Sequence, residues 1–193
     1  AHPGGGRNMI DDVLKDATRR MDKSVENARH EFTTVRTGRA AATLLDRVQV
    51  TAYGTKMPVN QLATIGVPEP RMLTITPFDK SIMKDIERGI LESDLGLTPS
   101  NDGQLIRLPI PQLTEERRKD LVRQVRHMAE EGRVATRNVR RDAIHQLKEL
   151  EKNGETGSDD VHRAEDRLQK LTDERVHQID AALKAKEAEI MEV

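Results

Sequence analysis

The sequence predicts an α+β protein, in which a small β/α/β domain is inserted into an elongated three-helix bundle. Three observations support this prediction. Apolar residues recur at helical spacing over three long segments of the chain. A shorter central segment alternates apolar and polar residues and is interrupted by proline and glycine, as strands and turns are. One of the long segments also carries a row of basic residues on one face.

The first predicted helix covers residues 9–37. Its apolar and small residues follow a 4-3 spacing, which places them on one face because an α-helix has about 3.6 residues per turn. They are Ile10, Leu14, Ala17, Met21, Ser24, Ala28, Phe32 and Val35. Gly38 is predicted to end the helix. Residues 1–8, which include the run AHPGGGR, are interpreted as a leader or tag remnant outside the fold.

Residues 39–112 form the predicted inserted domain. Alternation at Val48, Val50 and Ala52 indicates a strand, and further strands are expected in 57–67, 73–76 and 105–110. Residues 80–94 are expected to form a short helix that ends at Gly96. Because the insert leaves and re-enters the bundle, two connections join the domains, and the predicted hinge residues are Gly38, Arg39, Pro109 and Pro111. A rigid elbow at the same place remains the alternative.

Two further helices are predicted at 114–153 and 159–191. Thr114 and Ser158 are the expected N-caps, and Asn153-Gly154 is expected to end the second helix. The bundle would therefore consist of residues 9–38 and 113–193.

The second helix carries a basic stripe on one face, consisting of Lys119, Arg123, Arg126, Arg133, Arg137 and Arg140. A mostly apolar row is offset by two residues, about 200° around the helix, and holds Leu121, Val125, Met128, Gly132, Ala135 and Val139. Residues 117–141 have a net charge of +6 and residues 149–193 of −6, whereas the whole chain carries only −1. This distribution favours a surface for a polyanion, and an ordinary solvated helix face is the alternative.

Composition excludes several classes of function. The chain has no Cys, so disulfides, thiolate metal sites and Cys nucleophiles are excluded, and aromatic residues amount to only 2%, too few for a base-stacking platform. No nucleotide-binding or hydrolase motif is present, and His30-Glu31 point in different directions on a helix. Asp159-Asp160 suit a helix N-terminus better than a metal site. We therefore expect no catalytic residue, no metal and no cofactor, and, without a membrane span or signal peptide, a cytoplasmic protein.

Four segments carry a resemblance to a known family. They are Arg36–Ala40, Ser93–Leu97, Leu113–Leu121 and Val134–Ala143. Through them the chain, from Met9 to Val193, closely resembles the bacterial ribosome recycling factors. The resemblance implies an L-shaped, monomeric protein that binds the 50S subunit and the 70S post-termination ribosome across the A and P sites. Elongation factor G, using GTP, would then split the ribosome and release mRNA and tRNA. The factor itself would not be an enzyme.

The resemblance also assigns site residues. Those matching large-subunit rRNA contacts of the family are Arg36, Arg137 and Arg140, and Arg133 and Arg141 extend the same basic surface. Gly38 and Pro111 match the family's hinge segments. Two positions depart from the family pattern. Ala52 precedes Tyr53 where relatives often have two tyrosines, and Gln112 stands where some have proline.

Two other classes of protein remain open from the sequence. One is a helical adaptor that binds RNA or DNA outside translation, and the other is a coiled-coil partner whose apolar stripes are dimer seams. Cosedimentation with ribosomes rather than naked duplex would distinguish the first, and the mass in solution the second.

Overall fold

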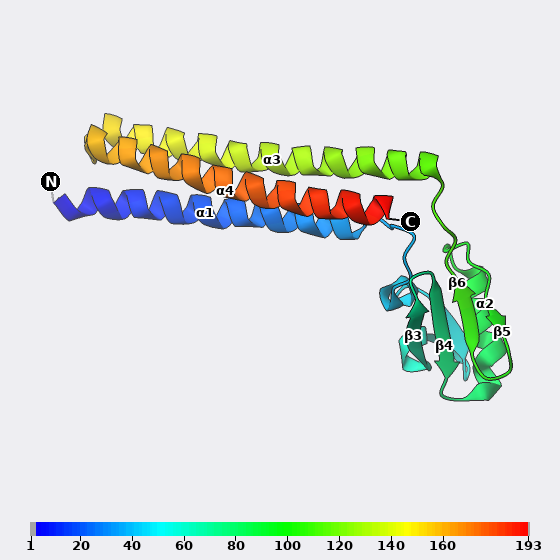
Figure 1. Cartoon of the computed structure of the whole chain (residues 1–193). Helices are drawn as coiled ribbons and strands as arrows, with labels where there is room; N and C mark the ends of the chain where they lie inside the picture. Colours follow the sequence, from blue (N-terminus) through cyan, green and yellow to red (C-terminus); the bar gives the residue numbers. More distant parts are fainter. Residues whose placement is uncertain (1–2, 193) are drawn as a thin grey trace. The chain divides into compact units, whose positions relative to one another are not determined.

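The computed structural model describes residues 3–192 of the chain, and the side chains of residues 8–192. It divides into two compact units. One contains the helices α1 (Pro3–Thr33), α3 (Glu115–Lys152) and α4 (Ser158–Met191), and the other is Arg36–Thr114 (Figure 1). Residues 1 and 2 of the leader expected at 1–8 lie outside the described residues, and α1 begins at Pro3, within that segment.

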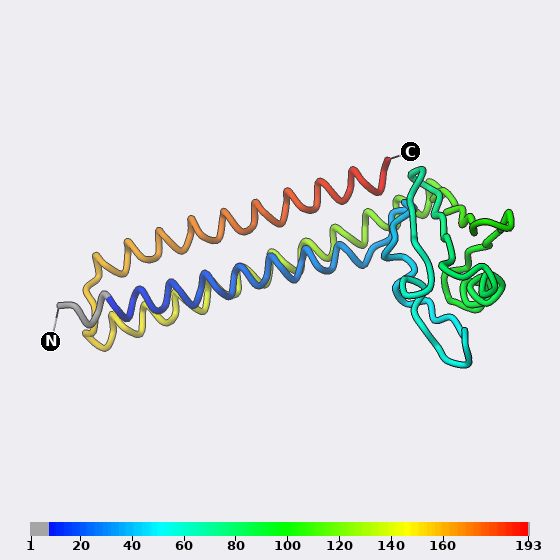
Figure 2. Tube along the Cα trace, turned by 90° about the horizontal axis from the view of Figure 1, so that it is seen from below, coloured from blue at the N-terminus to red at the C-terminus, as the bar shows by residue number. Residues whose placement is uncertain are grey.

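The first unit is a three-helix bundle in which each helix packs against the other two. The chain direction, given by colour in Figure 2, shows that α3 runs antiparallel to both α1 and α4. The core forms where the three apolar stripes meet. Side chains with no more than 2% of their surface exposed include Met21, Val25, Val125, Ala129, Leu147, Leu168 and Ile179. The predicted bundle of three long helices is thus observed.

The seam of α1 differs from the predicted one at a single position. Val25 is buried, whereas Ser24 is only half-buried and donates its hydroxyl to the carbonyl of Arg20. The helix also ends at Thr33, before the predicted residue 37. The hydroxyls of Thr33 and Thr34 bond back to the carbonyls of His30 and Glu31, both at 2.6 Å, and such local bonds compete with continuation of the helix.

Gly132 lies where side chains of both α1 and α4 approach α3. A Cβ at this position would lie 3.1 Å from Ala28 Cβ on α1 and 3.3 Å from Ile179 Cδ1 on α4. Glycine inside a helix costs about 1 kcal/mol of helix propensity relative to alanine. Here it is accommodated because the missing side chain lets α1 and α4 approach α3 closely.

The turn between α3 and α4 confirms one predicted boundary and corrects the other. Gly154 has a φ of 71°, its N–H donates to Glu151 O at 3.0 Å, and Glu155 N–H donates to Leu150 O at 2.9 Å. These two bonds form a Schellman motif, as the Asn153-Gly154 pair predicts. The N-cap of α4 is Gly157 rather than Ser158, which is already the first helical residue.

The second unit contains two antiparallel sheets. The smaller pairs β1 (Gln49–Ala52) with β2 (Thr55–Pro58). The larger has the order β3-β4-β6-β5, with β3 (Ala63–Glu69), β4 (Met72–Pro77), β5 (Ser100–Asn101) and β6 (Ile106–Pro109). The extended stretch expected within 57–67 corresponds to the end of β2 and the first residues of β3. A 3-10 turn, Val59–Gln61, divides this segment between the two sheets.

The predicted helix 80–94 is a 3-10 turn (Lys80–Ile82) followed by α2 (Met83–Glu92). The close approach of α2 to β1 depends on Gly89, where a Cβ would lie 2.9 Å from the carbonyl oxygen of Gln49. Completely buried side chains fill the space beneath: Val50, Val59, Leu73, Ile75, Ile86, Ile90, Ile106 and Leu108. The unit thus has its own core, separate from that of the bundle.

Candidate nucleic-acid interface

The basic residues of α3 form two rows rather than one outward stripe. An inner row, Arg126, Arg133 and Arg140, recurs every seven residues and reaches α4. An outer row, Arg123, Arg137 and Arg141, lies further around the helix and is exposed. The two rows differ in what their charges meet.

Acidic residues of α4 recur at the same seven-residue spacing as the inner row. They face it in reverse order, because α4 runs antiparallel to α3. Arg126 Nε donates to Glu187 Oε1 at 2.7 Å, and Arg133 Nε donates to Asp180 Oδ1 at 2.7 Å. A second nitrogen of Arg133 donates to Glu130 on its own helix, also at 2.7 Å. The charges of Arg126 and Arg133 are therefore compensated within the bundle.

The third member of the inner row is different. Arg140 Nη1 donates to the neutral amide oxygen of Gln169 at 3.1 Å, and Gln169 in turn donates to Asp173 at 2.9 Å. Because a side-chain amide separates the guanidinium from the carboxylate, Arg140 keeps its charge available to an external anion.

These ion pairs also shift the pKa values of Arg126 and Arg133. The hydrogen bond to Glu187, and next the charge of that residue, raises the pKa of Arg126. The hydrogen bond to Asp180 raises the pKa of Arg133 against the opposing effect of its partial burial, since only 19% of its side chain is exposed. Both arginines remain cations held in place by their partners.

The outer row carries the accessible charge. Arg137 and Arg141 are exposed, and no hydrogen bond or ion pair holds either one among residues 8–192. Arg123 lies 3.8 Å from Asp120, a loose pair on the exposed surface. Guanidinium groups in such a setting are free to contact phosphates bidentately.

The rRNA-binding residues expected from the resemblance therefore fall into distinct environments. Arg137, Arg140 and Arg141 lie within five residues on α3 and present available charge. Arg133 belongs to the same helix, but its charge is compensated. Arg36 is exposed and is the first residue of the other unit.

Sequence reasoning missed the acids that α4 brings to this surface. It also assigned two core positions of α3 wrongly, because Ala129 and Thr136 are buried, whereas Ala135 is exposed and Met128 only half-buried. Thr136 is accommodated because its hydroxyl bonds to the carbonyl of Gly132 at 2.9 Å. The signal for the acids was present in the sequence as a second seven-residue spacing, Asp173, Asp180 and Glu187.

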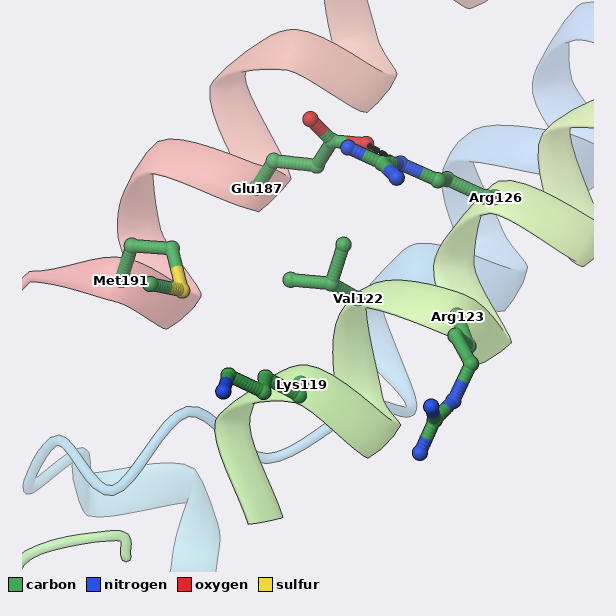
Figure 3. A pocket seen from close by; sticks show the side chains of 6 residues that line it. All are labelled: Lys119, Val122, Arg123, Arg126, Glu187 and Met191. Carbon is green, nitrogen blue, oxygen red and sulfur yellow. Dashed lines mark hydrogen bonds and ion pairs between the residues drawn. The ribbon is translucent and has the colours of Figure 1, made fainter. Parts of the chain in front are cut away.

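The surface contains a hollow between the start of α3 and the end of α4, with a volume of about 380 Å³ (Figure 3). Val122 and Met191 form its apolar part. The Arg126–Glu187 pair closes one side, and the charged ends of Lys119 and Arg123 point away from that pair. The hollow is thus a largely apolar depression with Lys119 and Arg123 at its edge.

The connections of the second unit are anchored on a single turn. Ala40 N–H donates to Pro70 O at 2.7 Å, and Ile110 N–H donates to Arg71 O at 2.8 Å. Pro109, one of the expected hinge residues, belongs to β6 and pairs with Met72. The chain leaves the sheet only after Ile110, so Pro109 is part of the sheet rather than of the connection.

The two connections meet just beyond these anchors. Gly38 has a φ of 77°, and a Cβ at this position would lie 3.1 Å from Leu113 Cγ. The remaining expected hinge residues are exposed, Arg39 on the first connection and Pro111 on the second. Glycine at position 38 thus permits the positive φ, and its missing side chain leaves room for the side chain of Leu113.

The described side chains contain no group of three or more His, Asp or Glu residues placed to hold a metal ion. Asp160 is instead bonded by Arg163 at 2.6 Å. None of the helices within residues 3–192 is both long and apolar enough to cross a membrane.

Together, these features define the class of protein: a three-helix bundle with an exposed cationic face and an inserted α+β unit. The chain matches the family "Ribosome recycling factor" over residues 28–191. It belongs to the ribosome recycling factor family.

Similar proteins extend this match to nearly the whole chain. It is 61% identical to the ribosome-recycling factor of Rubrobacter xylanophilus over 180 residues, covering 93% of this chain and 97% of that one. It is 54% identical to that of Listeria monocytogenes, with 96% and 100% covered. A solution structure of the ribosome recycling factor matches with a TM-score of 0.71 at 42% identity, covering 95% of this chain and 98% of that one.

A further solved structure matches with a TM-score of 0.60 at 45% identity, covering 95% of this chain and 99% of that one. It is described as models for the T. thermophilus ribosome recycling factor and the E. coli elongation factor G bound to the E. coli post-termination complex.

Proposed function

We propose that this protein recycles ribosomes. It binds the post-termination ribosome and, with elongation factor G and GTP, splits it into subunits and releases mRNA and tRNA. The observation that carries this proposal is the similarity to ribosome-recycling factors through both units, 61% over 93% of the chain in one relative. A structure of similar fold is described as models for a ribosome recycling factor and elongation factor G bound to the post-termination complex.

Large-subunit rRNA is the proposed ligand of the α3 surface. Arg137, Arg140 and Arg141 would contact phosphates directly, because no carboxylate compensates them among the described side chains. Arg133 would act mainly by holding α3 against α4. Arg36 would add a contact from its own unit. Such binding depends on phosphate and shape, which suits a chain with only three aromatic residues.

The proposed hinge consists of residues 36–39 and 111–114. Two features support it. Both connections are fixed to the sheet at Ala40 and Ile110, so bending is confined to the few residues beyond those bonds. Gly38, with its positive φ, can absorb torsional change that other residues resist. Movement of the insert would then reach the bundle through these two short segments.

The protein itself would perform no chemistry. We propose that it needs no cofactor, that elongation factor G binds and hydrolyses the GTP, and that the protein acts as a monomer in the cytoplasm, where its ribosomal substrate is found.

The test is a splitting assay on 70S ribosomes that carry mRNA and a deacylated tRNA. Subunit separation, followed by light scattering, should require the protein, elongation factor G and GTP together, and a non-hydrolysable GTP analogue should not support it. Absence of splitting would refute the proposal. Tight binding to naked duplex RNA would then favour a helical adaptor, and a dimeric mass a coiled-coil partner.

A further inference from the structure

The inner row of arginines faces α4 in one register, and its last member departs from that register. The ion pairs of Arg126 and Arg133 show that a step of seven residues along α3 corresponds to seven residues back along α4. The next step on both helices places Asp173 opposite Arg140. Arg140 nevertheless bonds Gln169, at 3.1 Å, and no ion pair holds it among residues 8–192. Gln169 therefore replaces an ion pair that the register would allow.

The side chain of Gln169 lies between two opposite charges and bonds both. Its Oε1 accepts from Arg140 Nη1, and its Nε2 donates to Asp173 Oδ1 at 2.9 Å. The reversed amide would set N–H against N–H and oxygen against a carboxylate oxygen, so the two charges determine which way the amide points. Gln169 thus separates Arg140 from Asp173 while giving each of them a hydrogen bond.

This hydrogen bond holds Arg140 in place without neutralising it. A guanidinium has five N–H donors, and here a neutral acceptor occupies one nitrogen, Nη1. The other two nitrogens have no partner among the side chains that the structure describes. Arg133, by comparison, gives Nε and Nη1 to two carboxylates. Arg140 therefore keeps both its charge and further donors for an external oxygen.

Holding the guanidinium also affects the cost of binding. Arg140 is half-buried, whereas its outer-row neighbours Arg137 and Arg141 are exposed and held by no partner among residues 8–192. A side chain that is already positioned loses less conformational entropy when it binds than a free one does. Of the three arginines, Arg140 is therefore the one whose geometry is set before a ligand arrives.

The alternative is that Gln169 only stabilises the packing of α3 against α4. A carboxylate at this position would bond the guanidinium more strongly, because a charge-assisted hydrogen bond is roughly twice as strong as a neutral one. The other two arginines of the inner row are held by such bonds. What the amide provides and a carboxylate would not is a cation that stays uncompensated.

We propose that Gln169 is a positioning residue for RNA binding, an inference that rests on the proposed function. Its amide holds the guanidinium of Arg140 and keeps it away from Asp173, so that the charge remains available to a phosphate of ribosomal RNA. Without the amide, the register of the two helices brings Arg140 to Asp173, as it brings the other inner-row arginines to their acids.

The test is Gln169→Glu in the full chain, with affinity for 50S subunits and thermal unfolding as readouts. Glutamate has nearly the shape of glutamine but would form an ion pair with Arg140. Affinity should fall roughly tenfold, the effect of one charge-assisted contact, and the slope of log K against log salt concentration should decrease by about 1. Tm should stay nearly unchanged, because the new ion pair offsets repulsion between Glu at 169 and Asp173 one turn away.

Two controls separate positioning from general repulsion of RNA. Gln146→Glu adds the same charge at an exposed position of α3, nine residues from Arg137, which is half a turn around the helix and about 14 Å along it. It should change affinity by less than about twofold. Gln169→Glu in an Arg140→Gln background should likewise have little further effect, because the charge that it would neutralise is already gone.

A second variant tests the same role without an added charge. Gln169→Ala removes the amide, so Arg140 should pair with Asp173 and affinity should again fall roughly tenfold. Adding Asp173→Asn to this variant should restore the affinity. Asp173→Asn alone measures the gain from removing a negative charge, and this gain should be smaller than the restoration. A residue that only stabilised the bundle would show no such rescue.

Unchanged affinity of Gln169→Glu would overturn the proposal. An equal loss of affinity in the Arg140→Gln background would also overturn it, because the added charge would then act directly on the RNA. So would failure of Asp173→Asn to restore binding in Gln169→Ala. If the unaltered protein did not bind 50S subunits, the proposed function itself would be refuted, and this would be seen before any variant is compared.

Discussion

Arg137→Gln should weaken binding to the large ribosomal subunit without loosening the bundle. Arg137 is exposed and held by no carboxylate among residues 8–192, so its substitution removes a charge that the folded protein does not use. Arg167→Gln on α4 is the matched control. Arg167 is also exposed and unpaired there, and it lies two residues from Gln169, which places it about 200° away from the side of α4 that meets Arg140.

The size of the effect follows from the environment of the charge. Arg133 is 2.7 Å from two carboxylates. Arg137 has no such partner among residues 8–192, so its full charge is available to a phosphate. One lost charge-assisted contact costs about tenfold in affinity. It should also reduce the slope of log K against log salt concentration by about 1. Arg167→Gln should alter the affinity by less than about twofold, because it lies on another face and salt screens charges beyond about 8 Å.

Affinity is measured by cosedimentation with 50S subunits across a salt series from about 50 to about 200 mM, the range in which phosphate contacts are most sensitive. Far-UV circular dichroism and thermal unfolding should be the same for both variants and the unaltered protein. If Arg137→Gln and Arg167→Gln weakened binding equally, the accessible outer row would not be the binding surface. An unchanged salt slope in Arg137→Gln would equally refute the phosphate contact.

Three further outcomes are expected. Arg133→Gln and Asp180→Asn should each destabilise the bundle, with a coupling of about 0.5 kcal/mol in a double-mutant cycle of thermal unfolding, and additive effects would mean that the pair contributes nothing. Gly38→Ala should destabilise its unit by about 1 kcal/mol and slow splitting, because alanine is strained at positive φ; Tm and splitting rate test this. The hydrogen bond from the hydroxyl of Tyr53, the single tyrosine, to Asp79 raises the pKa of that hydroxyl. The bond should therefore persist below pH 10 and be lost as the pH rises through the raised pKa. Asp79→Asn should move the absorbance titration back towards the usual pKa.

Elements whose structure depends on nearby residues were predicted well. The three long helices follow from apolar spacing, and the end of α3 follows from Gly154, whose φ and two bonds involve only residues 150–155. The end of α1 was placed too late. The apolar spacing continues to Val35, which is buried, but the hydroxyls of Thr33 and Thr34 end the helix before it. Hydrogen bonds from side-chain hydroxyls to the backbone leave the spacing of apolar residues unchanged, so that spacing does not reveal where such bonds end a helix.

Elements that depend on distant partners were predicted less well. Residues 57–67 look like one extended segment, yet β2 pairs back to β1 and β3 pairs forward to β4. Pairing of this kind is determined by which strands find each other, and alternation alone does not encode it. The exposed hairpin residue Tyr53 was likewise visible in the sequence, but its bond to Asp79, 26 residues away, was not.

The amino-acid sequence by itself determined that α3 carries a dense row of arginines and that the inserted segment carries no net charge. It also determined, through four specific segments, the family to which the chain belongs. Only the tertiary structure decided which arginines remain available. Asp180 and Glu187 lie 47 and 61 residues beyond Arg133 and Arg126, and they reach α3 because the helices fold back in antiparallel register. Charge along a sequence is local, but its neutralisation depends on distances in space, and these exist only once the helices have packed.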